Sequence, residues 1–237
     1  MTISSVNPCA NITDWLQAIG TVGAVIIALF FFFWERIREW YKKPRLKISL
    51  QFRPPDCHFL VTNLEAKRNG KIINPKAYYF RLTVSNNGRS SAKDLEAIVS
   101  KMELKSGHSW ETYPQFLSTS LKWTHISEQY LPMILSKTEK KLDLGHIIDP
   151  AFRNDFREEQ NLSLNNIADT HALFHFETFM QPSNGYNNIP PGEYKFKITV
   201  GATNCPPISS TIHLLFTGKW NNQEDLMLPK EINLAIE

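Results

Sequence analysis

The sequence predicts a mainly β fold, in which a single N-terminal transmembrane helix is followed by an antiparallel β-sandwich. Three observations predict it: a long uncharged segment near the N-terminus, short segments of alternating hydrophobicity after it, and clusters of Asn, Gly, Pro and Ser between those segments. The chain has 237 residues, of which 42% are hydrophobic, and a net charge of +3. This composition can supply a sizeable core, and three cysteines are too few for a disulfide scaffold.

The predicted transmembrane helix covers residues 15–34, which read WLQAIGTVGAVIIALFFFFW. Only Gln17 and Thr21 are polar here, so the apolar character runs around the whole helix. At ~1.5 Å per residue the segment is ~30 Å long, which matches the hydrocarbon core of a bilayer. We expect the anchor to be retained, because no basic residue precedes it and large aromatic residues stand where a signal-peptide cleavage site needs small ones.

The charges that flank this helix predict its orientation. The one charged side chain in residues 1–14 is Asp14, whereas six cationic side chains lie between residues 35 and 47. The positive-inside rule therefore predicts a single-pass protein of the inner membrane, with three segments outside the bilayer: a short extracytoplasmic tail (1–14), a basic juxtamembrane helix (35–45) and a cytoplasmic β-sandwich domain (46–237). We expect the helix to end at Lys43, because Pro44 disfavours helical geometry in the residue before it. The predicted membrane-interface residues are Trp15, Trp34, Trp40, Tyr41, Arg36, Arg38, Lys42, Lys43, Arg45 and Lys47.

The basic excess lies entirely beside the predicted membrane segment. Without residues 35–47 the chain has 20 basic and 21 acidic residues, so no nucleic-acid partner is expected. The cluster is either a topology signal alone or also a contact with anionic lipid headgroups, and the lipid bilayer is the expected partner. Gly20, Ala24 and Ala28 recur every four residues and place small side chains on one helix face. A second helix could approach this face closely, so homo-oligomerisation is a hypothesis, although such spacing is common in spanning helices.

The strongest strand patterns lie in two places. Alternating residues from Tyr78 to Val84 predict a half-buried strand, which the turn at 85–88 separates from a second strand that begins at Ala92; we expect these two strands to pair. Residues 194–200 and 209–216 predict another pair. Weaker strand candidates are residues 46–52, 57–61, 121–124, 140–144, 172–179 and either 226–228 or 232–236. Residues 149–160 are compatible with a short helix or a loop.

Two segments carry a resemblance to a known type of module. Residues 80–99 read FRLTVSNNGRSSAKDLEAIV, with an N-x-G-x-x-x-A pattern at Asn86, Gly88 and Ala92, and residues 189–204 read IPPGEYKFKITVGATN. Both resemble immunoglobulin-like or fibronectin-type modules of bacterial surface and membrane proteins. The arrangement as a whole resembles bacterial membrane-anchored proteins of unknown function with such a domain, which implies an immunoglobulin-like antiparallel β-sandwich and brings no active site. About 190 residues follow Lys47, against ~100 in a simple module, so extra strands or insertions such as 102–137 are expected.

No motif of known chemistry is present: G-x-G-x-x-G, G-x-x-x-x-G-K-[ST], H-E-x-x-H, G-x-S-x-G and C-x-x-C are all missing. We therefore predict no catalytic residue, no cofactor and no metal. His171 and His175 have the spacing of helical metal ligands, but their neighbours predict a strand, which would hold them ~13 Å apart. Cys57 and Cys205 are predicted to be small buried thiols. Three acid–histidine pairs are interpreted as solvated polar positions: His175 with Glu177, Asp56 with His58, and Asp143 with His146.

Trp110, Tyr113 and Phe116 form a possible docking patch if they lie on an exposed loop, although most aromatic side chains of a sandwich fill the space between its sheets. The function that the sequence favours is a membrane-anchored cytoplasmic module that binds or senses an unknown protein partner through its loops or an open sheet edge. Two alternatives stay open. One is a membrane-perturbing effector of a defence or toxin system that oligomerises through its helix, and the other is a membrane-bound enzyme of unrecognised type, against which the missing motifs count.

Overall fold

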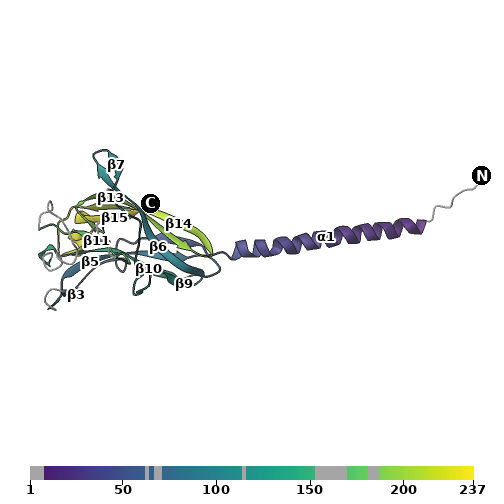
Figure 1. Cartoon of the computed structure of the whole chain (residues 1–237), viewed down its shortest axis with the longest axis horizontal. Helices are drawn as coiled ribbons and strands as arrows, with labels where there is room; N and C mark the ends of the chain where they lie inside the picture. The colour runs from purple at the N-terminus through teal and green to yellow at the C-terminus, as the bar shows by residue number, and fades with distance from the viewer. Residues whose placement is uncertain (1–7, 62–63, 67–70, 114–115, 153–169, 181–186) are drawn as a thin grey trace, which may run out of the picture. The chain divides into compact units, whose positions relative to one another are not determined.

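A computed structural model describes the chain except for residues 1–7, 62–63, 67–70, 114–115, 153–169 and 181–186. The chain divides into two compact units, Met1–Lys43 and Pro44–Glu237. The first contains helix α1 (Pro8–Lys42), and the second is a β domain (Figure 1). The boundary falls at Pro44, as the sequence predicts, since proline restricts the residue before it to extended geometry.

Helix α1 is long and apolar enough to cross a membrane. Residues Thr13–Trp34 form a 22-residue stretch with a mean hydropathy of 2.3, none of it buried within the protein. The hydroxyl of Thr21 donates a hydrogen bond to the Gln17 carbonyl (2.8 Å), so this polar group is satisfied within the helix. The helix begins at Pro8, so residues 8–14 of the predicted tail are helical, and it ends one residue before the predicted end.

One sheet of the β domain has six strands: β1 (Leu46–Ser49), β2 (Cys57–Val61), β5 (Lys76–Asn86), β10 (Glu139–Ile148), β11 (Phe174–Phe176) and β12 (Asn188–Ile189). The order is β1-β5-β10-β11-β12. Strands β1 and β2 both pair with the same edge of β5, β1 with residues 83–86 and β2 with residues 76–80. All these pairings are antiparallel. A register shift between Asp143 and Gly145 marks a bulge in β10, where two residues oppose one on β5.

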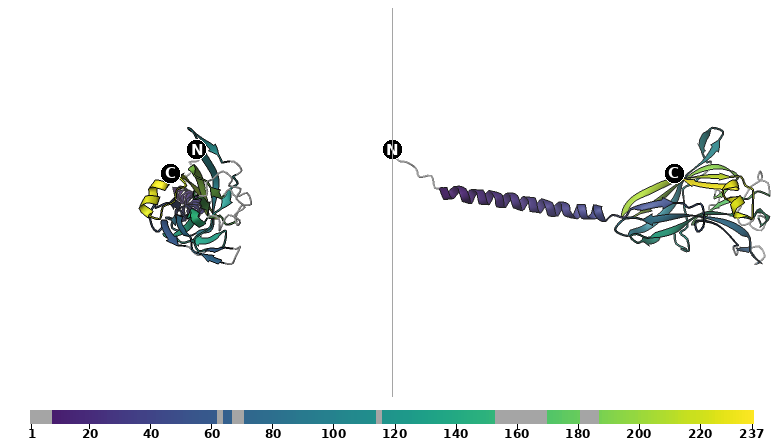
Figure 2. Two further views of the ribbon diagram at one scale, coloured as in Figure 1. Left: turned by 90° about the vertical axis from the view of Figure 1, so that its left-hand side faces the viewer. Right: turned by 180° about the vertical axis from the view of Figure 1, so that it is seen from behind.

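The second sheet has seven strands: β6 (Ala92–Ser106), β7 (Ser109–Thr112), β8 (Thr119–Ser120), β9 (Leu131–Ile134), β13 (Gly192–Ala202), β14 (Cys205–Phe216) and β15 (Ile232–Ile236). The order is β15-β14-β13-β6-β7, with β8 and β9 also paired to β6. The β6–β7 hairpin projects beyond the other strands (Figures 1 and 2). Smaller elements are the strand pair β3 (Leu64–Ala66) and β4 (Lys71–Ile73), and the helical segments η1 (Pro150–Phe152), α3 (Glu224–Leu226) and η2 (Met227–Glu231).

Six of the strands can be compared with the strand order of an immunoglobulin-like sandwich. Such a fold places strands A, B and E together in one sheet and strands C, F and G in the other. Here β1, β5 and β10 are neighbours in one sheet, and β6, β13 and β14 are neighbours in the other. Two features depart from the simple module: the strand beside β10 is β11, which follows it in the chain, and β15 extends the second sheet beyond β14. Extra strands of this kind are what the chain length predicts.

Aromatic rings join the two sheets across the core. Phe176 at the end of β11 lies 4.8 Å from Phe196 of β13, measured between ring centroids, and Phe174 lies 6.4 Å from Phe196. Tyr194, at the start of β13, is buried and its hydroxyl donates to the Pro190 carbonyl (3.0 Å), four residues upstream. This is the tyrosine corner of immunoglobulin-like sandwiches. In antibody domains a disulfide cysteine stands two residues after that tyrosine, and here the position holds Phe196.

The predicted pairing of residues 78–84 with the strand that begins at Ala92 is wrong. Both strands exist, but β5 belongs to the first sheet and β6 to the second. The connection is a corner that Asn86 holds: its side-chain oxygen accepts from the Gly88 amide (3.0 Å), and its side-chain nitrogen donates to the Ser90 carbonyl (2.7 Å). Two strands that each bury one face in the same core can face each other across it as well as pair side by side, and their alternation alone does not distinguish the two.

The other strand predictions are largely confirmed. The pair at 194–200 and 209–216 is the β13–β14 hairpin, whose second strand already begins at Cys205. Strands also form within 46–52, 57–61, 172–179 and 232–236, and β10 covers 140–144. Residues 121–124 contribute only isolated bridges at Leu121 and Trp123. Within 149–160, η1 is helical, and residues from 153 onward lie outside the described part of the chain.

Candidate functional site

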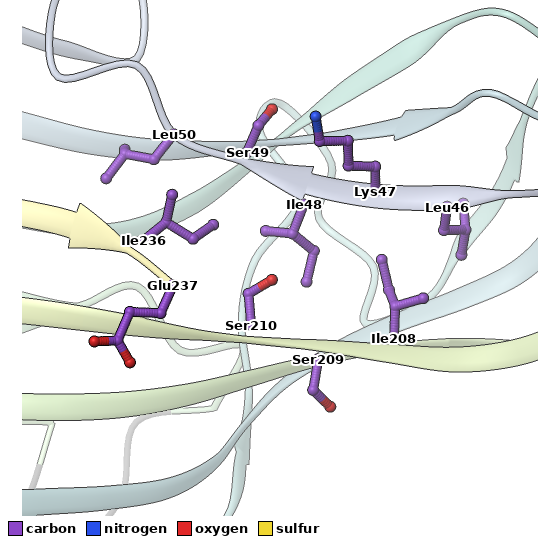
Figure 3. A pocket seen from close by; sticks show the side chains of 10 residues that line it. All are labelled: Leu46, Lys47, Ile48, Ser49, Leu50, Ile208, Ser209, Ser210, Ile236 and Glu237. Carbon is purple, nitrogen blue, oxygen red and sulfur yellow. The ribbon is translucent and has the colours of Figure 1, made fainter.

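An open groove lies between the two sheets, where β1 forms the edge of the first sheet and β14 lies near the edge of the second. Its volume is about 440 Å³. Residues from three segments line it: Leu46, Lys47, Ile48, Ser49, Leu50, Ile208, Ser209, Ser210, Ile236 and Glu237. Ile48, Ile208 and Ser210 point into the groove, whereas Lys47 and Ser209 point away from it (Figure 3). The floor is therefore apolar, with one serine hydroxyl.

The backbone of β1 is open toward this groove. The Asn87 amide donates to the Arg45 carbonyl (2.7 Å), which fixes the peptide groups of Arg45 on the β5 side. Because successive peptide groups of a strand point to opposite sides, those of Leu46 and Ile48 point away from β5. In the described part of the chain β1 pairs only with β5, so these groups are the exposed edge of the sheet.

The facing part of β14 is a poorer edge. Strand β15 pairs with β14 only from Ile212 to Phe216, and the Glu237 amide then donates to the Thr211 carbonyl (2.9 Å). Beyond that point β14 contains Pro206 and Pro207, which carry no amide hydrogen. An added strand would therefore find alternating donors and acceptors on β1, and mainly apolar side-chain contacts on the β14 side of the groove.

A second polar site lies on the outer face of the first sheet, where the rings of three strands stack. The ring of His146 lies 5.1 Å from the ring of Tyr79 on one side and 5.1 Å from the ring of His175 on the other. Beside the stack β10 packs closely against β11, because a Cβ at Gly145 would lie 2.3 Å from the His175 carbonyl oxygen. Glu177 binds the His146 Nδ1 (2.7 Å) and the Lys122 Nζ (3.2 Å).

The pKa values of His175 and Glu177 are both lowered at this site. Burial, with a smaller contribution from the charge of His146, lowers the pKa of His175 to about 3. Burial of Glu177 would raise its pKa, but the His146 hydrogen bond, the His146 charge and the Lys122 ammonium outweigh it and lower the pKa to about 2. His175 is therefore neutral and Glu177 ionised near neutral pH.

Among the described residues this arrangement is not completed to a hydrolytic site. Within the described residues, the imidazole of His146 has Glu177 as its one side-chain hydrogen-bond partner, so no nucleophile is bonded to it. The same described residues contain no group of three or more His, Cys, Asp or Glu side chains that could hold a metal ion. Glu177 thus has a histidine partner, but that partner is His146 and not the sequence neighbour His175.

Two residues of the acid–histidine pairs, Asp56 and His175, are buried, so the prediction that they are solvated is wrong. Asp56 is fully buried and accepts from the Lys141 Nζ (2.7 Å), and His175 is also buried. Asp143 bonds Arg81 Nε (2.9 Å) rather than His146.

The three aromatic residues of the predicted docking patch lie in different surroundings. Trp110 stands on β7, where the Lys195 Nζ is 4.4 Å from its ring centroid. Tyr113 packs against Tyr194, 6.1 Å between ring centroids, and both Tyr113 and Phe116 are partly buried against the core. Trp110 therefore lies beside a lysine of β13, whereas Tyr113 and Phe116 pack against the core. The three residues do not share one surface environment.

The residues assigned to the membrane are exposed within the protein. Gly20, Ala24 and Ala28 lie on α1 with exposed or half-exposed surfaces, and a Cβ at Gly20 would meet no atom within 4 Å. Among the predicted interface residues the Trp40 side chain lies outside the described ones, and the rest are exposed: Trp15, Trp34, Arg36, Arg38, Tyr41, Lys42, Lys43, Arg45 and Lys47. Their contact with lipid stays a prediction.

The two cysteines of the β domain are free thiols. Cys57 is fully buried, and burial together with the charge of Asp56 raises its pKa to about 12, so it behaves as an inert apolar side chain. Cys205 is only partly buried, and that burial raises its pKa as well. The prediction of small buried thiols is thus confirmed for Cys57 and only partly for Cys205.

Sequence reasoning alone did not find the groove. Two sequence features belong to the groove: the weak strand pattern at 46–52 and the two prolines at the start of β14. Which strands are edge strands, however, depends on the order of strands in the sheets. Comparisons with known proteins add no assignment, since no protein-family model, curated protein or solved structure matches the chain. Any function proposed for the chain therefore rests on its own residues.

Proposed function

We propose that the chain is a single-pass protein of the bacterial inner membrane whose cytoplasmic β domain binds an extended segment of a partner protein, added as a strand along β1. The single observation that carries this proposal is the groove with an open backbone edge on one side and apolar side chains on the other. The long apolar helix and the cations that follow it support the membrane location and the orientation with the β domain in the cytoplasm. The immunoglobulin-like strand order supports a relationship to bacterial surface and membrane modules of that type.

Strand addition fits the chemistry of both walls. The outward peptide groups of Leu46 and Ile48 would supply hydrogen bonds that do not depend on the partner's sequence. Every second side chain of the added segment would point into the groove toward Ile208 and Ile236, so the partner should be apolar at alternate positions. The edge is only four residues long, which suits a short segment rather than a whole sheet.

Neighbouring serines on β14 provide a matched test. Ser210 points into the groove and Ser209 points away from it (Figure 3). The full chain in nanodiscs would be used to select binders from a random peptide library, and the selected peptides would then be titrated against Ser210→Trp and Ser209→Trp. We expect peptides with alternating apolar residues and at least about tenfold weaker binding to Ser210→Trp, equal to about 1.4 kcal/mol, because the indole fills the groove.

The control Ser209→Trp should bind the peptides as the natural chain does. Thermal unfolding of both variants would verify that each keeps its fold. Equal binding by the two variants, or selected peptides without alternation, would rule out the groove as the binding site.

A further inference from the structure

One end of the β domain is a single continuous surface around the point where the chain enters from α1. Backbone hydrogen bonds tie its segments together: the Asn87 amide donates to Arg45 (2.7 Å), the Lys137 amide to Asn86 (2.8 Å), and the Thr203 amide to Lys93 (3.0 Å). The corner after β5, the turn before β10 and the β13–β14 turn therefore lie at the same end of the domain as Arg45. We call this end the basic pole, defined by residues 45–47, 86–94, 133–140 and 202–205.

The basic pole has a marked excess of positive charge. Its acidic residues are Asp94 and Glu139, of which Asp94 accepts a hydrogen bond from the Thr203 hydroxyl (3.2 Å) and Glu139 lies 3.6 Å from the Lys141 Nζ. From residue 48 to residue 237 the chain contains equal numbers of basic and acidic residues, so the excess belongs to this end and not to the domain as a whole. Its exposed cations are Arg45, Lys47, Arg89, Lys93, Lys137 and Lys140.

Exposed apolar side chains stand among these cations. Leu135 is 54% exposed and Met133 is 43% exposed, and they flank Ile134, whose carbonyl is held by the Asn86 side chain (3.1 Å). Apolar side chains next to Lys and Arg are typical of surfaces that lie in the headgroup region of a membrane, where the cations meet lipid phosphates and the apolar groups reach the acyl boundary.

The length of the connection keeps the basic pole near the bilayer whatever the orientation of the two units. From Trp34 to the end of α1 the helix rises ~12 Å, at ~1.5 Å per residue. Four further residues reach Leu46, which adds at most ~14 Å when fully extended. Lipid headgroups fill the first several ångströms beyond the hydrocarbon core, and a tilted helix shortens the distance further.

We propose that the basic pole binds the anionic headgroups of the leaflet from which α1 emerges. This inference rests on the proposed membrane crossing of α1; the pole shares Leu46 and Lys47 with the groove but does not require a bound peptide. The cations of the pole would lie against lipid phosphates, Leu135 and Met133 would enter the headgroup layer, and the domain would be held against the membrane instead of swinging on its tether.

Fluorescence energy transfer in nanodiscs tests the proposal with the full chain. A donor dye is placed at Asn87→Cys on the basic pole or at His108→Cys on the exposed β6–β7 turn, with Cys9 and Cys205 replaced by serine and the buried Cys57 kept. The acceptor is attached to lipid headgroups. Discs of phosphatidylcholine alone are compared with discs of equal parts phosphatidylcholine and phosphatidylglycerol. We expect transfer from position 87, but not from position 108, to rise in the anionic discs, and the rise to be lost in high salt.

Charge-reversal variants with equal changes in net charge complete the test. Arg89→Glu with Lys93→Glu and Lys137→Glu should abolish the rise. The matched control replaces three exposed lysines outside the pole, Lys197, Lys219 and Lys230, by glutamate and should keep it. Equal transfer in both discs, equal loss in both triple variants, or a response of position 87 to an added RNA fragment in place of lipid would overturn the proposal. If α1 failed to cross the membrane, the chain would instead not co-purify with the discs at all.

Discussion

The side-chain amide of Asn86 is fully buried and bonds four backbone groups, those of Arg45, Gly88, Ser90 and Ile134. It therefore ties the start of β1, the corner after β5 and the end of β9 to one point. The sequence pattern N-x-G at residues 86–88 marks this corner, and the structure supplies its physical reason. Asparagine fits because one amide provides both an acceptor and a donor.

Replacing Asn86 by alanine should lower the free energy of unfolding by about 3 kcal/mol or more, because it leaves several buried backbone groups without a partner. The neighbouring Asn87→Ala, whose side chain is exposed, is the control and should change stability by less than about 0.5 kcal/mol. Chemical unfolding followed by tryptophan fluorescence measures both. Similar stability of the two variants would mean that the corner does not depend on this amide.

His175 and Glu177 predict how the stability of the domain depends on pH. The folded state keeps His175 neutral, so below its ordinary pKa of 6.5 the unfolded chain binds a proton first and stability falls as pH falls. Glu177, with its pKa lowered to about 2 from 4.5, adds to this loss only at more acidic pH. Between about pH 6.5 and about pH 5, His175 should therefore contribute a decline of up to about 1.4 kcal/mol per pH unit.

The variant His175→Phe, which keeps an aromatic ring in the stack, should flatten this decline when unfolding is measured across the pH range. His108→Phe, at an exposed turn, should retain the decline of the natural chain. An unchanged slope in His175→Phe would contradict the assignment.

At the scale of elements, hydrophobic alternation located most strands but predicted only one of the two proposed strand pairs correctly. Residues 78–84 and 194–200 alternate clearly because one face of each strand is buried in the core and the other is not. The partners depend on whether the chain turns back within a sheet or crosses to the other one, and a five-residue connection such as 87–91 permits both. The groove could not be predicted for the same reason. It lies beside an edge strand, and an edge strand can be identified only from the strand order of the sheet.

The tyrosine corner at Tyr194 illustrates a signal that the sequence contained and pattern reasoning passed over. The segment PPGEY predicts a turn before a strand and carries part of the resemblance to immunoglobulin-like modules, and it also places a buried tyrosine four residues after the proline carbonyl to which its hydroxyl donates. The stacked rings of Tyr79, His146 and His175 had no such signal, because they come from three strands that are far apart in the sequence.

At the scale of the whole molecule, the membrane orientation follows from charge and hydropathy alone and stays a prediction. Alkaline carbonate should leave the chain in the membrane fraction, because a predominantly apolar stretch of 22 residues makes a span that salt and pH do not extract. Protease added to intact spheroplasts should spare the β domain, whereas protease added to inverted vesicles should digest it.

A matched variant without residues 15–34 should appear in the soluble fraction. Digestion of the β domain in intact spheroplasts would reverse the proposed orientation, and it would place both the groove and the basic pole on the other side of the membrane.

Membrane proteins meet their own copies at high local concentration. An open edge strand that pairs with the same edge of another copy could then nucleate filaments. Successive peptide groups of a strand point to opposite sides, so of Pro206 and Pro207 one removes an amide hydrogen from the outer edge of β14, and the edge of β1 is only four residues long. Both features disfavour a long continuous ladder from one copy to the next. The same two features would leave the domain able to accept a single short guest while its neighbours in the membrane stay separate molecules.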